Sequence, residues 1–207
     1  MNTGQAHSET RAPGRREAVP VAAAAPLEAA VSARPGRFRL LFAADEWLLL
    51  RMRRWHGPWR TRLARGLTRA GDGKSWTLVA LAFLATRTPT GVHLGLRLAA
   101  ATLLATLLSQ VLKRGLNRPR PTRAIEGFTA LAENPDAFSF PSGHTAAASA
   151  VAVALAGQGH GLGPASLALA AGIGLSRVYL GAHYPLDVAA GAALGAVAGA
   201  LARLLLG

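Results

Sequence analysis

Cysteine is absent from this chain of 207 residues. No disulfide can therefore support its fold, and no thiolate can bind a metal ion. Charge is scarce as well, since charged residues make up 16% of the sequence and hydrophobic residues 51%. That balance points away from an ordinary soluble protein, and it favours a membrane protein long enough for one domain with a sizeable core.

Acidic residues are few, with 10 against 23 basic residues and a net charge of +13. Two explanations compete for this charge. One is nucleic-acid binding, and the other is a membrane protein whose cations meet anionic headgroups and a phosphate site. Lysine is rare among the basic residues, with two Lys against 21 Arg. Arginine binds phosphate bidentately, but codon usage in a high-GC genome would produce the same bias.

The first 74 residues differ in composition from the rest of the chain. Residues 1–36 are rich in Ala, Pro, Arg, Gly and Glu without apolar periodicity, so we expect a disordered basic tail and no signal peptide. Residues 38–56 mix leucines and tryptophans with six charges, which makes a membrane-spanning helix costly. Within 37–74 we therefore expect an interfacial amphipathic helix and then an Arg-rich linker. A soluble-type helix packed on the rest of the protein is the alternative.

Residues 75–207 carry five apolar segments, near 75–86, 92–112, 144–157, 163–182 and 186–206. These segments predict an all-α fold, a multi-pass transmembrane helix bundle that forms a membrane-embedded domain. In the last segment Gly191, Gly195 and Gly199 recur at a spacing of four residues. That spacing places them on one helix face, where small residues allow two helices to approach closely in lipid.

Two polar clusters lie between these segments. In the first, Lys113 and Arg114 end an apolar segment, and the prolines of Arg118-Pro-Arg120-Pro121 stop the helix. Basic residues in contact with lipid headgroups would explain this cluster equally well. In the second, Pro141-Ser142-Gly143-His144 precedes an Ala-rich segment. Ser142 is a good N-cap, and the amides that follow it would seat a phosphate, although helix capping alone also explains this motif.

The third cluster runs from Ser176-Arg177 to His183 and Asp187. Pro185 predicts that His183 lies on a loop and that Asp187 lies in the first turn of the last helix. Asp187 can then accept the imidazole N–H and leave the other ring nitrogen free to attack. A single His–Asp pair is more often a structural contact. In an up-and-down bundle, however, all three clusters reach the same end, which favours a phosphoryl-transfer site.

Together the three clusters resemble the type-2 phosphatidic acid phosphatase superfamily, which includes lipid phosphate phosphatases and vanadium haloperoxidases. That family's pattern is Lys-x6-Arg-Pro, then Pro-Ser-Gly-His, then Ser-Arg-x5-His-x3-Asp, and every element is present here in order. The resemblance implies that His183 is the nucleophile that forms a phosphohistidine, that Asp187 orients it and that His144 protonates the leaving group. The phosphate-binding residues that it implies are Lys113, Arg120, Ser142, Gly143 and Arg177.

Apolar segments around these motifs fit the small prokaryotic membrane branch of the family. The resemblance implies a lipid phosphatase that needs no cofactor or metal. Its substrate would be a polyprenyl diphosphate, phosphatidate, phosphatidylglycerophosphate or a phosphorylated prenyl sugar. Its partners would be this phosphorylated lipid and the bilayer, with no nucleic acid. A vanadate-dependent haloperoxidase would use the same pocket but is expected to be soluble, and a non-catalytic membrane protein would not need three complete motifs.

The site is expected at the inner membrane of the cell. Eight basic residues lie between positions 51 and 74, whereas the connections 87–91 and 158–162 carry only Arg87 and His160. By the positive-inside rule, this asymmetry favours a cytoplasmic site if residues 38–56 lie on the membrane, and an outward-facing site if they span it. The loop 122–140 contains Phe128, Leu131, Phe138 and Phe140, which we expect to dip into lipid beside the site.

Overall fold

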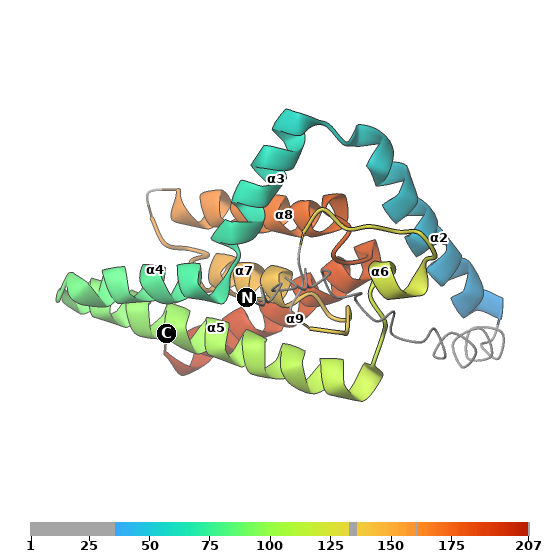
Figure 1. The fold of residues 1–207 in the computed structure, drawn as a ribbon. Helices are drawn as coiled ribbons and strands as arrows, with labels where there is room; N and C mark the ends of the chain where they lie inside the picture. Colours follow the sequence, from blue (N-terminus) through green and yellow to red (C-terminus); the bar gives the residue numbers. More distant parts are fainter. Residues whose placement is uncertain (1–35, 133–135, 160, 207) are drawn as a thin grey trace, which may run out of the picture. The chain divides into compact units, whose positions relative to one another are not determined.

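The computed structural model describes residues 36–132, 136–159 and 161–206. The expected disordered tail therefore lies, except for Gly36, outside the described residues. Regular structure within the described ranges is helical, which confirms the all-α prediction (Figure 1). The elements are α2 (Gly36–Met52), the 3-10 helix η1 (Arg53–Trp55), α3 (Pro58–Ala70), α4 (Gly73–Ala85), α5 (Pro89–Leu116), α6 (Pro121–Ala124), α7 (Gly143–Ala154), α8 (Leu162–Tyr179) and α9 (Pro185–Leu205).

Each of the five predicted apolar segments corresponds to one helix, from α4 to α9 with the short α6 excepted. Two of these helices, α5 and α9, are long and apolar enough to cross a membrane. The Arg-rich stretch was expected to be a linker, but it folds into α3. Pro58 begins this helix and Gly71 ends it, and Arg is a good helix former, so the linker interpretation gave its charge too much weight.

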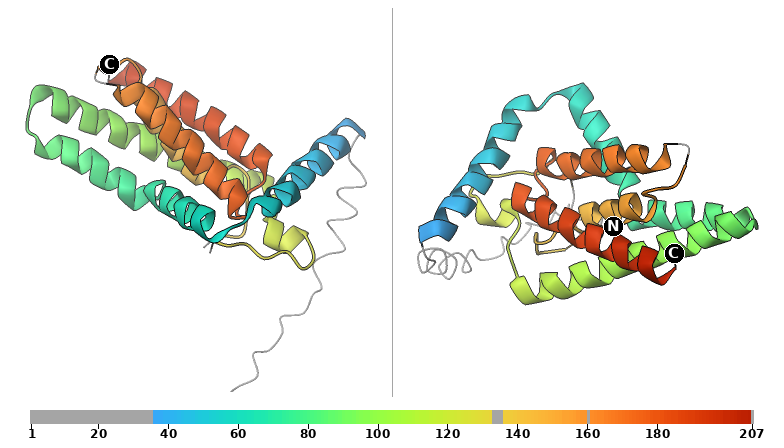
Figure 2. Two further views of the ribbon diagram at one scale, coloured as in Figure 1. Left: turned by 90° about the horizontal axis from the view of Figure 1, so that it is seen from above. Right: turned by 180° about the vertical axis from the view of Figure 1, so that it is seen from behind.

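Helix α7 lies at the centre of the bundle and packs against α5, α8 and α9 (Figures 1 and 2). Its alanine side chains are small, so the backbones of neighbouring helices can approach α7 closely. Ala146, Ala150 and Ala154 are fully buried. The predicted glycine face of α9 lies against them. A Cβ atom built on Gly195 would come within 2.1 Å of the Ala146 carbonyl oxygen, and one on Gly199 within 2.4 Å of the Ala150 carbonyl oxygen. Glycine is thus required for this contact.

Helix α5 has an inner face that packs in the bundle and an outer face that is exposed. Its inner face carries Leu98, Ala101 and Ala105, all of them buried. Its outer face carries Leu103, Leu107 and Val111, each more than half exposed. Small residues inside and large aliphatic residues outside are typical of helices that pack in lipid.

One end of the bundle collects the polar clusters, as predicted. There α5 ends, α7 begins, α8 ends and α9 begins, and the loop after α6 crosses between them. Helix α2 also packs at this end, where Leu49 joins Val178 and Tyr184 in a small buried cluster. Phe128 belongs to the same cluster and is 6% exposed. The expectation that Phe128 dips into lipid was therefore wrong, because α2 covers the surface that its ring was expected to present.

Candidate active site

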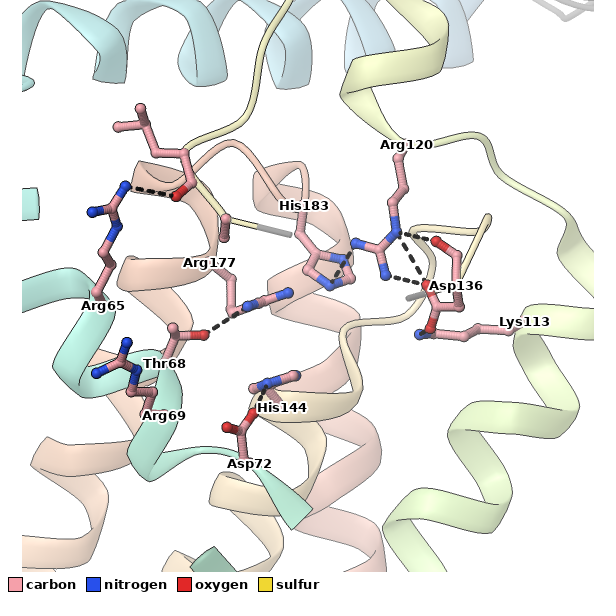
Figure 3. A pocket seen from close by; sticks show the side chains of 12 residues that line it. Arg65, Thr68, Arg69, Asp72, Lys113, Arg120, Asp136, His144, Arg177 and His183 are labelled. Atoms are coloured by element: carbon pink, nitrogen blue, oxygen red, sulfur yellow. Dashed lines mark hydrogen bonds and ion pairs between the residues drawn. The ribbon is translucent and has the colours of Figure 1, made fainter. Parts of the chain in front are cut away.

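A cavity of about 580 Å³ opens at this end of the bundle. Side chains from α3, α5, α7 and α8, and from the four connections that follow α3, α5, α6 and α8, converge on it (Figure 3). Five residues predicted from the sequence line it, namely Lys113, Arg120, His144, Arg177 and His183. The remaining lining residues are Arg65, Thr68, Arg69, Asp72, Leu131, Ala132 and Asp136. The cavity is strongly cationic, which suits a phosphate group.

His183 lies on the loop between α8 and α9, where Pro185 at the first position of α9 sets the helix start. The imidazole is 1% exposed, and its Nδ1 lies 2.7 Å from the backbone oxygen of Ser139. Because a carbonyl oxygen can only accept, Nδ1 carries the proton and Nε2 keeps its lone pair. Burial lowers the pKa of His183 to about 4; Asp187 opposes this effect, and Arg177 and Arg120 add to it. The ring is therefore neutral at physiological pH.

Asp187 lies behind His183 rather than in the cavity, in the first turn of α9 as predicted. One carboxylate oxygen accepts from the Tyr184 amide at 2.9 Å and stands 3.6 Å from His183 Nδ1. The other accepts from Arg118 at 2.7 Å. The Ser139 carbonyl, not the carboxylate, is therefore the hydrogen-bond acceptor for Nδ1, and Asp187 acts on the imidazole as a nearby buried charge.

Lys113 and Arg120 share a carboxylate that the sequence analysis missed. Lys113 Nζ lies 2.5 Å from one oxygen of Asp136, and the Arg120 guanidinium donates to the other oxygen and to the Asp136 backbone. Burial alone would raise the pKa of Asp136, but these hydrogen bonds outweigh it and hold the pKa below its ordinary value. The carboxylate oxygens of Asp136 thus bind Lys113 and Arg120 in the way that phosphate oxygens would. Arg120 Nη1 also bonds the Ala182 carbonyl and stands 3.3 Å from His183 Nε2.

Arg177 enters the cavity from the last turn of α8 and is 4% exposed. Its Nη1 donates to the hydroxyl of Thr68 at 2.6 Å, which ties α3 to the site. Arg120 and Arg177 both lie beside His183 (Figure 3). Two buried guanidinium groups and one ammonium group at the nucleophile favour a substrate with two or more negative charges.

His144 stands in the first turn of α7 at the edge of the cavity, with about a third of its side chain exposed. Its Nε2 lies 2.7 Å from an oxygen of Asp72, the residue that precedes α4. Burial lowers the pKa of His144 to about 4 and Arg177 adds to this effect, whereas the hydrogen bond to Asp72 opposes it. A phosphate bound beside the ring would add negative charge and so favour the protonated imidazole that a proton donor requires. Asp72 was not predicted from the sequence, because 71 residues separate it from His144.

Ser142 and Gly143 are placed differently from the cations. Ser142 is fully buried at the N-cap position of α7, but its hydroxyl accepts from Thr145 at 2.9 Å and makes no cap bond to the backbone. Its amide donates to the Asp187 carbonyl at 2.9 Å. Gly143 is the first residue of the helix, and a Cβ there would meet nothing within 4 Å. The Gly143 amide has no acceptor within the helix, but neither Ser142 nor Gly143 is among the residues that line the cavity.

Comparison with known proteins identifies a family and several relatives. A family model described as the PAP2 superfamily matches residues 94–206. Decaprenylphosphoryl-5-phosphoribose phosphatase from Mycobacterium tuberculosis is 34% identical over 145 residues, which cover 70% of this chain and 79% of that protein. Lipid A 1-phosphatase from Rhizobium etli is 36% identical over 106 residues, or 49% of this chain. The match spans 46% of the Rhizobium protein, somewhat under half its length.

Solved structures agree as well. The transmembrane PAP2 type phosphatidylglycerolphosphate phosphatase from Bacillus subtilis superimposes with a TM-score of 0.68 at 25% identity. The superposition covers 86% of this chain and 90% of that one. This coverage extends beyond residues 94–206, so the likeness includes helices that precede the family match.

Proposed function

The chain belongs to the PAP2 superfamily, and from that premise we propose that it is an integral-membrane phosphatase acting on a phosphorylated lipid through a phosphohistidine at His183. One observation carries the proposal. A buried imidazole presents an unprotonated Nε2 beside Arg120, and Lys113 and Arg177 line the same cavity. A neutral nucleophile within a cluster of fixed cations suits attack on the phosphorus of an anionic substrate.

In the first step, Nε2 of His183 attacks phosphorus and the bond from phosphorus to the leaving oxygen breaks. The Ser139 carbonyl and the Asp187 carboxylate stabilise the positive charge that develops on the ring. His144 donates its proton to the leaving oxygen, and Asp72 stabilises the imidazolium before the transfer. Lys113, Arg120, Arg177 and the Gly143 amide bind the phosphoryl oxygens once Asp136 gives up its contacts.

In the second step, water attacks the phosphohistidine. His144 is now neutral and takes a proton from that water as the bond from phosphorus to Nε2 breaks. Inorganic phosphate leaves, and both histidines return to their starting states. Cations and amides supply all of the charge stabilisation in this scheme, so it needs no metal ion.

The lipid classes named in the sequence analysis remain the proposed substrates. The Mycobacterium relative is named for a phosphorylated prenyl sugar and the Rhizobium relative for the 1-phosphate of lipid A. Both names describe a phosphate at the polar end of a large lipid. A cavity at the end of an apolar bundle, with aliphatic side chains on the outer helix faces, suits such a molecule.

The test is phosphate release by purified protein in detergent with a chelator present. We expect release from phosphatidate, phosphatidylglycerophosphate, a polyprenyl diphosphate or a phosphorylated prenyl sugar, and no effect of chelator on the rate. The haloperoxidase alternative is tested in parallel with vanadate, bromide and peroxide. No release from any of the four lipids would overturn the proposed function.

We also propose that the site faces the cytoplasm. Cations that lie at the site end but do not line the cavity support this orientation, namely Arg51, Arg53, Arg54, Arg60 and Arg62. Helix α2 packs at the end of the bundle rather than along its length (Figure 2), as an interfacial helix would. With α2 on the membrane surface, the positive-inside rule directs this end inward.

A further inference from the structure

A chain of charged contacts connects α2 to the active site without entering the cavity. Asp45 on α2 is 2% exposed and accepts a hydrogen bond from Nη2 of Arg118 at 2.7 Å. Nη1 of the same guanidinium donates to Asp187 at 2.7 Å. One arginine thus joins two buried carboxylates, and one of these carboxylates lies beside His183.

The planar faces of Arg118 are also in contact. Its guanidinium carbon lies 4.1 Å from the ring centre of Tyr184 and 5.0 Å from that of Phe42. A guanidinium held by aromatic rings and by two carboxylates has a fixed orientation, because any rotation would break a charge-assisted hydrogen bond. Arg118 therefore holds Asp187 in one position.

The second oxygen of Asp45 reaches the start of α9. It accepts from the Leu186 amide at 2.8 Å. Leu186 is the second residue of α9, and amides in the first turn of a helix have no acceptor within that helix. Asp45 therefore caps α9 from another helix, and it secures both the side chain of Asp187, through Arg118, and the helical turn that carries it.

Contact with the membrane does not explain Asp45. The outer side of α2 carries Leu40, Trp47 and Leu48, all more than a third exposed. That side suffices for an interfacial helix. A buried carboxylate costs free energy unless it is paired, so its place facing inward calls for a role within the protein.

We propose that Asp45 is a positioning residue of the active site, acting through Arg118 to hold Asp187 beside His183. The inference rests on the proposed function. It makes α2, which precedes the matched residues 94–206, a working part of the catalytic site.

The test compares Asp45→Asn with Glu46→Gln. Both remove one negative charge from neighbouring positions on α2, but Glu46 is exposed and lies outside the contact network. We expect Asp45→Asn to lower kcat by about 10-fold, because it frees Arg118 and through it Asp187, in the way that losing an outer-shell partner impairs a metal ligand. KM, and the Kd of orthophosphate measured by calorimetry, should stay within about twofold, because the cavity cations are untouched.

A double-mutant cycle with Arg118→Gln identifies the route. If Asp45 acts through Arg118, the double variant will be no slower than the slower single variant. A double variant whose loss of kcat is the product of the two single losses would overturn the proposal. So would an Asp45→Asn variant whose kcat equals that of the Glu46→Gln control. The concentration of folded sites in each variant is measured by orthophosphate binding, so that kcat is expressed per binding site. A kcat per binding site in Asp45→Asn equal to that of the wild type would indicate a merely structural role for Asp45 and overturn the proposal.

Arg118→Lys covers the case in which Asp45→Asn does not fold. One ammonium group cannot bridge both carboxylates as the planar guanidinium does, so kcat should fall at unchanged KM. Wild-type kcat in this variant would overturn the proposal. An inactive wild-type protein would overturn the proposed function instead. If the wild-type protein is active and Asp45→Asn leaves its kcat unchanged, only this inference is overturned.

Discussion

At the residue scale, His183 combines a neutral imidazole with neighbouring cations. The Ser139 carbonyl selects the tautomer, and burial disfavours the charged ring. These two effects keep Nε2 available for attack, while Arg120 and Arg177 attract the phosphate toward it. The tautomer of His183 and the binding of phosphate therefore depend on different neighbours, whereas Arg120 and Arg177 bind phosphate and also help to lower the pKa of the ring.

A pH profile tests the state of His183. Its pKa of about 4 keeps the nucleophile neutral from pH 7 down to about pH 5. The sign follows from the lowered pKa, because activity is fully present above it and is lost only as pH falls through it. An imidazole with the ordinary pKa would lose about thirtyfold in its neutral fraction by pH 5. With nitrophenyl phosphate, whose leaving group does not need the proton of His144, we expect kcat/KM, corrected for the substrate's own ionisation, to change by less than about threefold over that range.

Leaving-group dependence tests His144. His144→Ala should slow hydrolysis of a lipid phosphate by about 10²- to 10⁴-fold, because the departing alkoxide needs a proton. Hydrolysis of nitrophenyl phosphate should suffer much less, because nitrophenolate leaves without one. Asp72→Asn should show the same pattern with a smaller loss, since it removes only the partner of His144. Equal losses on both substrates would assign His144 to binding rather than proton transfer.

The motif residues were predictable because their spacing is local and specific. Five of the predicted site residues line the cavity, and Asp187 and Ser142 lie directly behind it. The acidic partners Asp45, Asp72 and Asp136 were not predicted. Each pairs with a residue more than 20 positions away, and isolated carboxylates in a sequence carry no signal of such pairing.

At the element scale, α7 and α9 pack with their backbones in close contact. Gly195→Ala would place its Cβ 2.1 Å from a backbone oxygen, so α9 would have to move away from α7. Overpacking of this kind costs about 1–3 kcal/mol, and we expect the melting temperature in detergent to fall by about 2–12 °C. Gly66→Ala on α3 is the control, because its Cβ would meet nothing within 4 Å. Similar melting temperatures for the two variants would contradict the packing account.

The two helices before α4 were harder to predict than the five apolar ones. Helix α3 carries four arginines, so its short apolar side, where Leu67 meets Gly172 and Ala64 is buried, did not stand out. Helix α2 was predicted as an amphipathic helix, but its inward contacts were not. The inward side chains, Asp45 and Leu49, bind residues that lie far along the chain.

At the scale of the whole molecule, the amino-acid composition predicted a membrane protein. Large aliphatic side chains cover the outer faces of α5 and α9, whereas alanine and glycine fill the interior. Orientation in the membrane depends on the charge difference between the two ends, and the sequence carries that difference in the arginines around α3.

Single cysteines test this orientation, because the native chain has none. Thr122 on α6 is exposed at the site end, and Thr90 is exposed at the start of α5, at the opposite end. With a cytoplasmic site, Thr122→Cys should resist a membrane-impermeant thiol reagent in intact cells and react after lysis. Thr90→Cys should react without lysis. The reverse pattern would place the site outside and contradict the proposed orientation.

Trapping the phosphoenzyme tests the central claim most directly. Purified protein is mixed with a lipid carrying labelled phosphate and quenched within one turnover, and the label is located by peptide mapping. The account predicts an acid-labile, base-stable phosphohistidine at His183. It should be absent from His183→Asn, and in His144→Ala it should accumulate when an activated leaving group forms it, because its hydrolysis is then slow. Rapid phosphate release by His183→Asn, or label on another residue, would contradict the account.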